Sequence, residues 1–186
     1  MAENAGKRLF TEDFKFELGE VDVKRFRGTS KMDVAKRISG GLNCATCHQP
    51  PEFDIDPKSL NNGFDRGSGS RRTRDYSVTR SPPLRDLTGP TGEMNGPMFH
   101  GGTAGNIIGI KARYNFREFD ARNTNLDPRM VPGGKPQFLD ITAEEQRQLF
   151  AFLQTLTGSD VYVNEKWSDP FDKDGKLVLL PVKAGR

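Results

Sequence analysis

Residues 40–53, "GGLNCATCHQPPEF", contain both cysteines of the chain, Cys44 and Cys47, and His48 directly after the second. Three chemistries use a C-x-x-C pair. A redox dithiol begins a helix after a strand, whereas the preceding residues 33–41 read as a short helix that ends in glycines. A structural zinc site needs four closely spaced ligands, and the second histidine, His100, is far along the chain. The third chemistry, covalent attachment of haem c, has C-x-x-C-H as its signature.

The motif therefore favours one covalently attached haem c, with His48 as an iron ligand. On one helical turn, two thiols three positions apart reach the two vinyl groups of a porphyrin. Thioether attachment takes place outside the cytoplasm in bacteria, so we expect a periplasmic or otherwise extracytoplasmic protein. The N-terminus, "MAENAGKRLFTEDF", shows no apolar signal region.

The composition indicates one domain with a modest core. The chain has 186 residues, of which 34% are hydrophobic, together with 20 glycines and 12 prolines. This balance predicts long irregular loops that wrap a buried cofactor. The net charge of +3 indicates neither nucleic acid nor a membrane surface as a partner, and no apolar run is long enough for a membrane span.

Apolar spacing predicts few regular elements. Residues 8–28 alternate in part and are expected to be an extended or mixed segment, whereas 30–41 are expected to be a helix with Val34 and Ile38 inward. Residues 49–102 read as loop. A further helix opens at Thr103.

The strongest helix prediction lies within residues 140–158, "DITAEEQRQLFAFLQTLTG". Thr142 and Glu145 form a capping box, and Gly158 ends the helix. The tail, residues 159–186, is expected to form a small β-hairpin or extended segment.

Several motifs in order resemble a known family. They are "SLNNGF", "SPPLRDL", "GPMFHGG" followed by a helix, "NLDPRM" and "AFLQTLTG". Together with the C-x-x-C-H motif they look like the C-terminal haem domain of the bacterial di-haem cytochrome c peroxidase and MauG superfamily. The resemblance covers roughly residues 40–158.

The resemblance implies a mostly α, class I cytochrome c-like fold for the peroxidase-family-like core at 40–158. We expect a mono-haem domain over residues 1–158, and a C-terminal tail, residues 159–186, that lies outside the resemblance and is a candidate interface. Two departures matter. The family carries two C-x-x-C-H motifs, and this chain has one. The segment usually written H-D-G reads His100-Gly101-Gly102. Peroxidase activity therefore does not follow from the likeness.

Five residues are candidates for the sixth position of the iron: Met94, Met98, His100, Tyr114 and Met130. In the family, the distal ligand follows the H-D-G segment by about four helical turns, and MauG-like members have tyrosine there. The resemblance thus implies Tyr114, which shares a helical face with Ile107 and Ile110. The alternatives are that Tyr114 is a core residue and that Met130, from the loop before the last helix, is the ligand. His100 is expected to hydrogen-bond near the haem.

An arginine-rich stretch has three interpretations, one without a specific function and two functional. Its members are Arg66, Arg71, Arg72, Arg74, Arg80 and Arg85. In the first interpretation they only form a solvated loop. In the second, the outer arginines of the stretch bind an acidic redox partner. Arg85, in the segment resembling the family's S-L-R-N, is expected to bind a haem propionate, because guanidinium suits carboxylates.

The sequence therefore favours an electron-transfer cytochrome that passes single electrons between redox partners. The alternative is the haem subunit of a peroxidase or MauG-like enzyme, with a second haem on another chain or copy.

Overall fold

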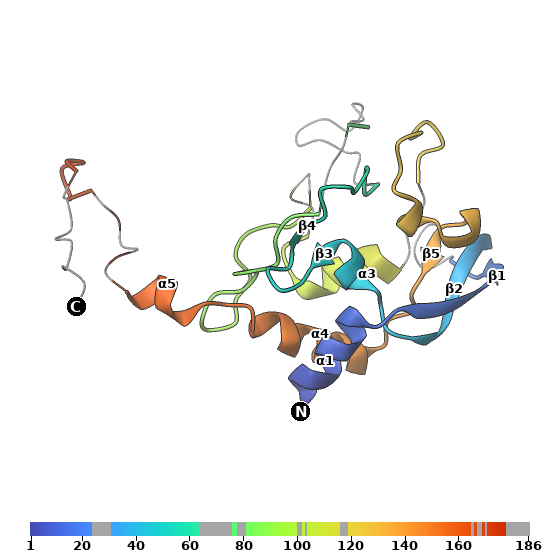
Figure 1. Cartoon of the computed structure of the whole chain (residues 1–186), viewed down its shortest axis with the longest axis horizontal. Helices are drawn as coiled ribbons and strands as arrows, with labels where there is room; N and C mark the ends of the chain where they lie inside the picture. The colour runs from blue at the N-terminus through green and yellow to red at the C-terminus, as the bar shows by residue number, and fades with distance from the viewer. Residues whose placement is uncertain are drawn as a thin grey trace.

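The computed structural model describes residues 1–23, 31–63, 76–77, 81–99, 102, 104–115, 119–164, 166, 169 and 171–177. None of the helices among these residues is long and apolar enough to cross a membrane. Figure 1 shows the helices α1 (Ala2–Thr11) and α4 (Ala143–Gln154) side by side below the loops, and the sheet that contains β1, β2 and β5 at one end. The elements in chain order are α1 (Ala2–Thr11), β1 (Phe14–Val21), β2 (Met32–Gly40), η1 (Cys44–Thr46), β3 (His48–Gln49), β4 (Asp54–Ile55), α3 (Ile107–Asn115), η2 (Pro128–Met130), η3 (Pro132–Gly134), β5 (Gln137–Phe138), α4 (Ala143–Gln154) and α5 (Ser159–Val163).

A three-stranded sheet makes the expectation of a mostly α, class I cytochrome c-like fold wrong. Its order is β1-β2-β5, with β1 and β2 antiparallel and β2 and β5 parallel. The extended prediction is confirmed for β1, whereas the helix predicted at 30–41 is the strand β2. The helical spacing of Val34 and Ile38 was misleading, because Val34 is buried and Ile38 is 55% exposed. Pairing with β1 along the whole of β2 overrides the local pattern.

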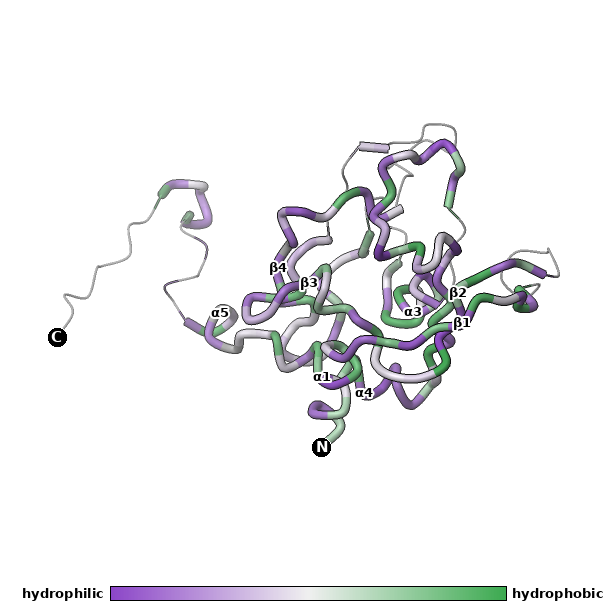
Figure 2. The backbone as a smooth tube through the Cα atoms, turned by 45° about the vertical axis from the view of Figure 1, so that its right-hand side comes forward, coloured by the Kyte–Doolittle hydropathy of each residue, from purple (hydrophilic) through white to green (hydrophobic). Residues whose placement is uncertain are grey.

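Helix α1, which the sequence analysis did not predict, crosses α4 at close range. A Cβ atom on Gly6 would overlap the backbone carbonyl of Gln148, so glycine is what permits the approach. The Phe10 ring lies 5.3 Å from Phe152 and 5.5 Å from Phe53, between centroids. In Figure 2 the hydropathy colour changes every few residues along both helices, as expected of helices with one buried face.

Helix α4 begins as predicted. The Thr142 hydroxyl accepts from the Glu145 amide, and the Glu145 carboxylate accepts from the Thr142 amide, which completes the capping box. Glu145 also receives two hydrogen bonds, at 2.7 and 2.8 Å, from Arg37 on β2. This largely buried ion pair joins the sheet to the helix.

The helix predicted from Thr103 is shorter than expected. Residues 104–106 are not helical, and α3 runs over Ile107–Asn115. At its C-terminal end, the Asn115 side chain accepts from the Ile141 amide at 2.6 Å, and its carbonyl accepts from the Leu139 amide at 3.1 Å. The end of α3 is thereby fixed beside the strand and loop that lead into α4.

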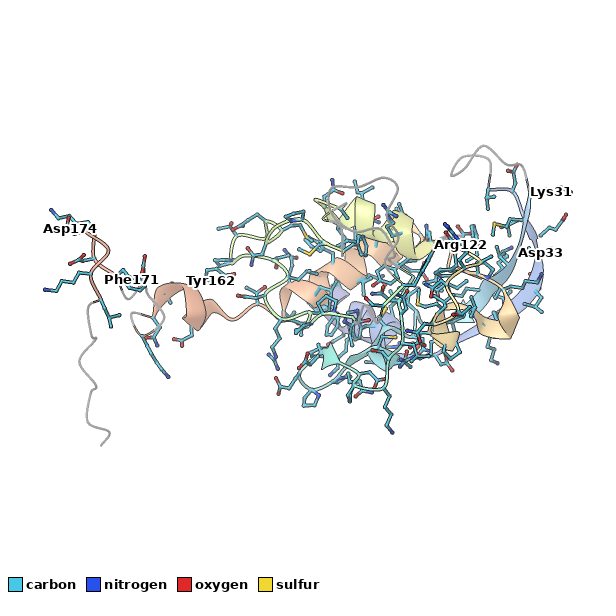
Figure 3. The ribbon with its side chains drawn as sticks, turned by 90° about the horizontal axis from the view of Figure 1, so that it is seen from above. Lys31, Asp33, Arg122, Tyr162, Phe171 and Asp174 are labelled. Atoms are coloured by element: carbon cyan, nitrogen blue, oxygen red, sulfur yellow. The ribbon has the colours of Figure 1, made fainter. Side chains whose placement is uncertain are left out.

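The tail differs from the hairpin prediction. Residues Ser159–Val163 form the helix α5, and within the described part of the tail one bridge joins Phe171 to Leu177. The Tyr162 hydroxyl accepts from the Asn95 side chain at 2.7 Å, which attaches α5 to the main body. Figure 3 shows Phe171 and Asp174 well beyond Tyr162, away from the body. Residues 178–186 at the end of the tail are outside the described residues.

The buried apolar side chains form three groups. The first group, Phe10, Phe53, Phe152 and Leu153, joins α1 to α4. The second, Val23, Val34 and Phe138, lies under the sheet. The third, Leu42, Leu139 and Ile141, joins the chain before η1 to the segment before α4.

Replacing Gly6 should test the helix crossing. We expect Gly6→Ala to lower the free energy of unfolding by about 1–3 kcal/mol, because the added methyl group meets the backbone of α4, which cannot move alone. Urea unfolding followed by circular dichroism measures the change.

Gly19→Ala is the matched control. No described residue lies within 4 Å of a Cβ at Gly19 on β1, so this change should leave stability within about 0.5 kcal/mol of the parent. Equal losses in the two variants would contradict the proposed role of Gly6.

Candidate functional site

The two cysteines lie on a single tight turn. Cys44–Thr46 form the 3-10 turn η1, and the Cys47 amide donates to the Cys44 carbonyl at 3.2 Å. Asn43, directly before the turn, has a left-handed backbone with φ of 54°, a conformation that asparagine tolerates better than most residues. Both thiols thus project from one compact loop between β2 and β3.

His48 is held as a neutral imidazole. Its ring is 7% exposed, and Nδ1 lies 2.9 Å from the Pro82 carbonyl oxygen. A carbonyl can only accept, so Nδ1 carries the proton and Nε2 keeps its lone pair. Burial lowers the His48 pKa to about 4, although the bond to Pro82 acts in the opposite direction. An imidazole oriented in this way is in the form that binds metals.

The thiols do not resemble those of a redox dithiol. Burial raises the pKa of Cys44 to about 12, with a smaller contribution from Cys47. Burial also raises the pKa of Cys47, and nearby Arg129 offsets this only in part. Reactive dithiols need a lowered thiol pKa. Both cysteines are free thiols in the structure.

A cavity of about 570 Å³ lies against this loop. Cys44, Cys47 and His48 all line it, as do Ile107 and Ile110 on α3. Its size is within the range of about 300–1,000 Å³ that is usual for small-molecule and cofactor sites. The C-x-x-C-H motif and the apolar face of α3 therefore border one space.

Three of the five candidate distal ligands line the same cavity: Tyr114, Met130 and Met98. Tyr114 is on α3, with its ring 6.2 Å from that of Phe99, and Met130 is the last residue of η2. Met94 bridges to Thr88 and is not among the described lining residues. His100 is outside the described part of the chain.

Arg85 also lines the cavity, but its guanidinium has a partner. Nε donates to Glu52 at 2.9 Å, and Nη2 donates to the Pro51 carbonyl at 3.1 Å. The Arg85 side chain is half exposed, so such a pair is weak and easily exchanged for another carboxylate. Its binding to a propionate remains a prediction. The other arginines of the stretch, Arg66, Arg71, Arg72, Arg74 and Arg80, lie outside the described residues.

Sequence reasoning missed an ion cluster beside the turn that carries the cysteines. Arg129, which lines the cavity, pairs with Asp56 at 2.7 Å and with Asp127 at 2.6 Å. The Asp127-Pro128 start of η2 could have been recognised as a helix cap with proline at the first position. No sequence pattern signals the pairing with Asp56, because the two partners are far apart in the chain.

A second missed residue is Asp86 in the cavity wall. Its backbone is left-handed, with φ of 60°, and its buried Oδ1 has no hydrogen-bond partner among the residues that the structure describes. A buried carboxylate oxygen without a donor is costly. A hydrogen-bond donor on a molecule bound in the cavity would therefore stabilise Asp86.

The donor set fits a haem. One imidazole nitrogen has its lone pair available, two thiols share one turn, and tyrosine and methionine side chains line the same apolar cavity. Histidine, tyrosine and methionine are all known axial ligands of haem iron.

In the cofactor-free chain, His48 should make stability depend on pH. Its folded pKa of about 4 is below the ordinary histidine pKa of 6.5, so between these values the unfolded chain binds a proton that the folded chain does not. The contribution of neutral His48 to the free energy of unfolding is complete above pH 6.5. It falls by about 3 kcal/mol as the pH drops to 4. His48→Gln should flatten this part of the curve. An NMR titration midpoint for His48 near 6.5 would contradict the buried neutral state.

No family model and no curated protein matches the chain. A solved structure described as "Crystal structure of a MauG-like protein associated with microbial copper homeostasis" aligns with 91% of this chain at 20% identity, with a TM-score of 0.53. The alignment covers 50% of that protein's chain, so this chain spans about half its length. At this identity the likeness concerns the fold: the chain shares the architecture of half of a MauG-like protein.

Proposed function

We propose that this protein is a c-type cytochrome that carries one covalently bound haem and transfers single electrons between redox partners outside the cytoplasm. The observation that carries the proposal is the cavity of about 570 Å³ bordered by Cys44, Cys47 and His48. The fold shared with half of a MauG-like protein supports it.

Three residues would hold the group. The thiols of Cys44 and Cys47 would each add across one vinyl group of the porphyrin, forming two thioethers. His48 would ligate iron through Nε2, because Nδ1 is committed to Pro82. When bound, the haem supplies a one-electron iron couple. The surrounding apolar side chains, among them Phe10 and Leu153, exclude water from the site.

Tyr114 is the distal ligand in this proposal, with Met130 as the alternative. Both line the cavity. A phenolate favours ferric iron and a low potential, whereas a thioether favours ferrous iron and a high potential. The identity of this residue therefore sets which partners can donate electrons and which can accept them.

The remaining assignments follow from this function. Arg85 would exchange Glu52 for a propionate, and His100 would hydrogen-bond near the group. The haem-carrying unit would be residues 1–158, and the tail, residues 159–186, would meet a protein partner. Three apolar side chains in the described part of the tail are at least half exposed, as expected of such a surface: Val163, Phe171 and Leu177.

Covalent attachment can be tested by mass. Full-length protein matured in a host that attaches haem c should gain the mass of one haem, retained under denaturing conditions. Cys44→Ala with Cys47→Ala should abolish the gain. An unmodified mass for the parent chain under these conditions would contradict the proposed function.

Two single variants decide the distal ligand. Tyr114→Phe keeps the ring and deletes the oxygen, so it should change the ferric spectrum and raise the midpoint potential, while Met130→Ala should leave the spectrum unaltered. Visible spectroscopy and redox titration measure both. The reverse pattern would assign Met130 as the ligand and make the protein a high-potential carrier.

A second candidate function is the haem subunit of a peroxidase or MauG-like oxidative enzyme, completed by a second haem on another chain or copy. The observation that favours it is that the similar solved chain is about twice as long. A ferric spectrum that peroxide does not change supports electron transfer, and a rapid change supports the enzyme.

A further inference from the structure

The Arg129 ion cluster lies next to the residues that would bind the haem. Arg129 uses four of the five N–H donors of a guanidinium. Nε and Nη2 donate to Asp127 at 2.8 and 2.6 Å. Nη1 donates to Asp56 at 2.7 Å and to the Thr46 carbonyl at 2.6 Å. One side chain thus joins η2 to the turn that carries the cysteines.

The cluster fixes the peptide groups on both sides of Cys47. Arg129 binds the carbonyl of Thr46, and the Asp56 amide donates to the carbonyl of Cys47 at 3.3 Å. Fixing these two carbonyls fixes the backbone of Cys47, and therefore the direction in which the Cys47 side chain and the following His48 leave the chain.

The carboxylates are themselves anchored. Asp56 accepts from the Lys58 amide at 2.9 Å, and Asp127 accepts from the Leu60 amide at 3.0 Å. Both side chains are less than 10% exposed. Burial would raise the Asp127 pKa, but the bonds from Arg129 and Leu60 outweigh it and leave the pKa at about 2. Hydrogen bonds from the Lys58 amide and from Arg129 also lower the pKa of Asp56, so both carboxylates remain ionised beside Arg129.

We propose that Arg129 is a positioning residue that orients the Cys47–His48 segment toward the cavity and couples it to η2, which carries Met130. This inference rests on the proposed function for its purpose and on the contacts above for its geometry. Lysine cannot replace Arg129, because a single ammonium group has three donors and no planar fork to span two carboxylates and a carbonyl.

Arg129→Lys is the test, with Arg37→Lys as its matched control. Arg37 also makes a forked pair with a carboxylate, Glu145, and binds backbone carbonyls, including that of Leu139 at 2.8 Å. It joins the sheet to α4 and is not among the described residues that line the cavity. If the two variants lose similar amounts of stability, a difference between them at the Cys47–His48 segment reflects positioning by Arg129 and not general destabilisation.

The first readout is amide hydrogen exchange of the full-length protein. Arg129→Lys should speed exchange at Cys47 and Asp56 about tenfold, as expected when a bond to a charged group is lost. Arg37→Lys should leave these two amides unchanged. Asp56→Asn, which keeps an acceptor oxygen but removes the charge, should have a smaller effect and serves if Arg129→Lys does not fold.

The second readout is the ferric spectrum and midpoint potential of the haem-loaded protein. Arg129→Lys should alter both, and Arg37→Lys neither. Parental exchange rates in Arg129→Lys, equal changes in both variants, or faster exchange with an unaltered spectrum would each overturn the inference. If the parent chain carries no haem, the proposed function fails, and the exchange rates still decide whether Arg129 fixes the segment.

Discussion

The close crossing of α1 and α4 is the contact on which the rest of the structure depends. Gly6 lets the helix backbones meet, and the resulting approach buries Phe10 against Phe152 and Phe53. The Phe10 ring is also 6.4 Å from that of His48. The helix pair therefore forms a wall of the cavity and reaches the proposed iron ligand. Without this contact, the chain between β2 and α3 would have little regular structure to pack against.

Two forked arginines extend the order that the helices create. Arg37 joins the sheet to the start of α4, and Arg129 joins the cysteine turn to η2. Each makes charge-assisted hydrogen bonds between segments that are distant in sequence. Buried ion pairs add little net stability but are costly to break on one side, so their main effect here is to specify one arrangement of the segments that they join.

Sequence reasoning succeeded where the determinants are local. The capping box of α4, the extended character of β1 and the shared face of Ile107, Ile110 and Tyr114 are set by neighbours within a few residues. It failed for β2, whose helix-like spacing is overridden by pairing with β1, and for α1, whose burial depends on α4. The Arg129 cluster could not be predicted, because Asp56 becomes its partner only when the loops have folded.

The central claim is that the cysteine turn and His48 hold one haem through two thioethers. The most direct measurement is the absorption spectrum of the purified, matured protein after denaturation and reduction in alkaline pyridine. In this solvent the main visible band depends only on how many vinyl groups are saturated. The account predicts the band of a haem with both vinyl groups converted to thioethers. A band typical of unsaturated vinyl groups, or no haem band, would contradict it.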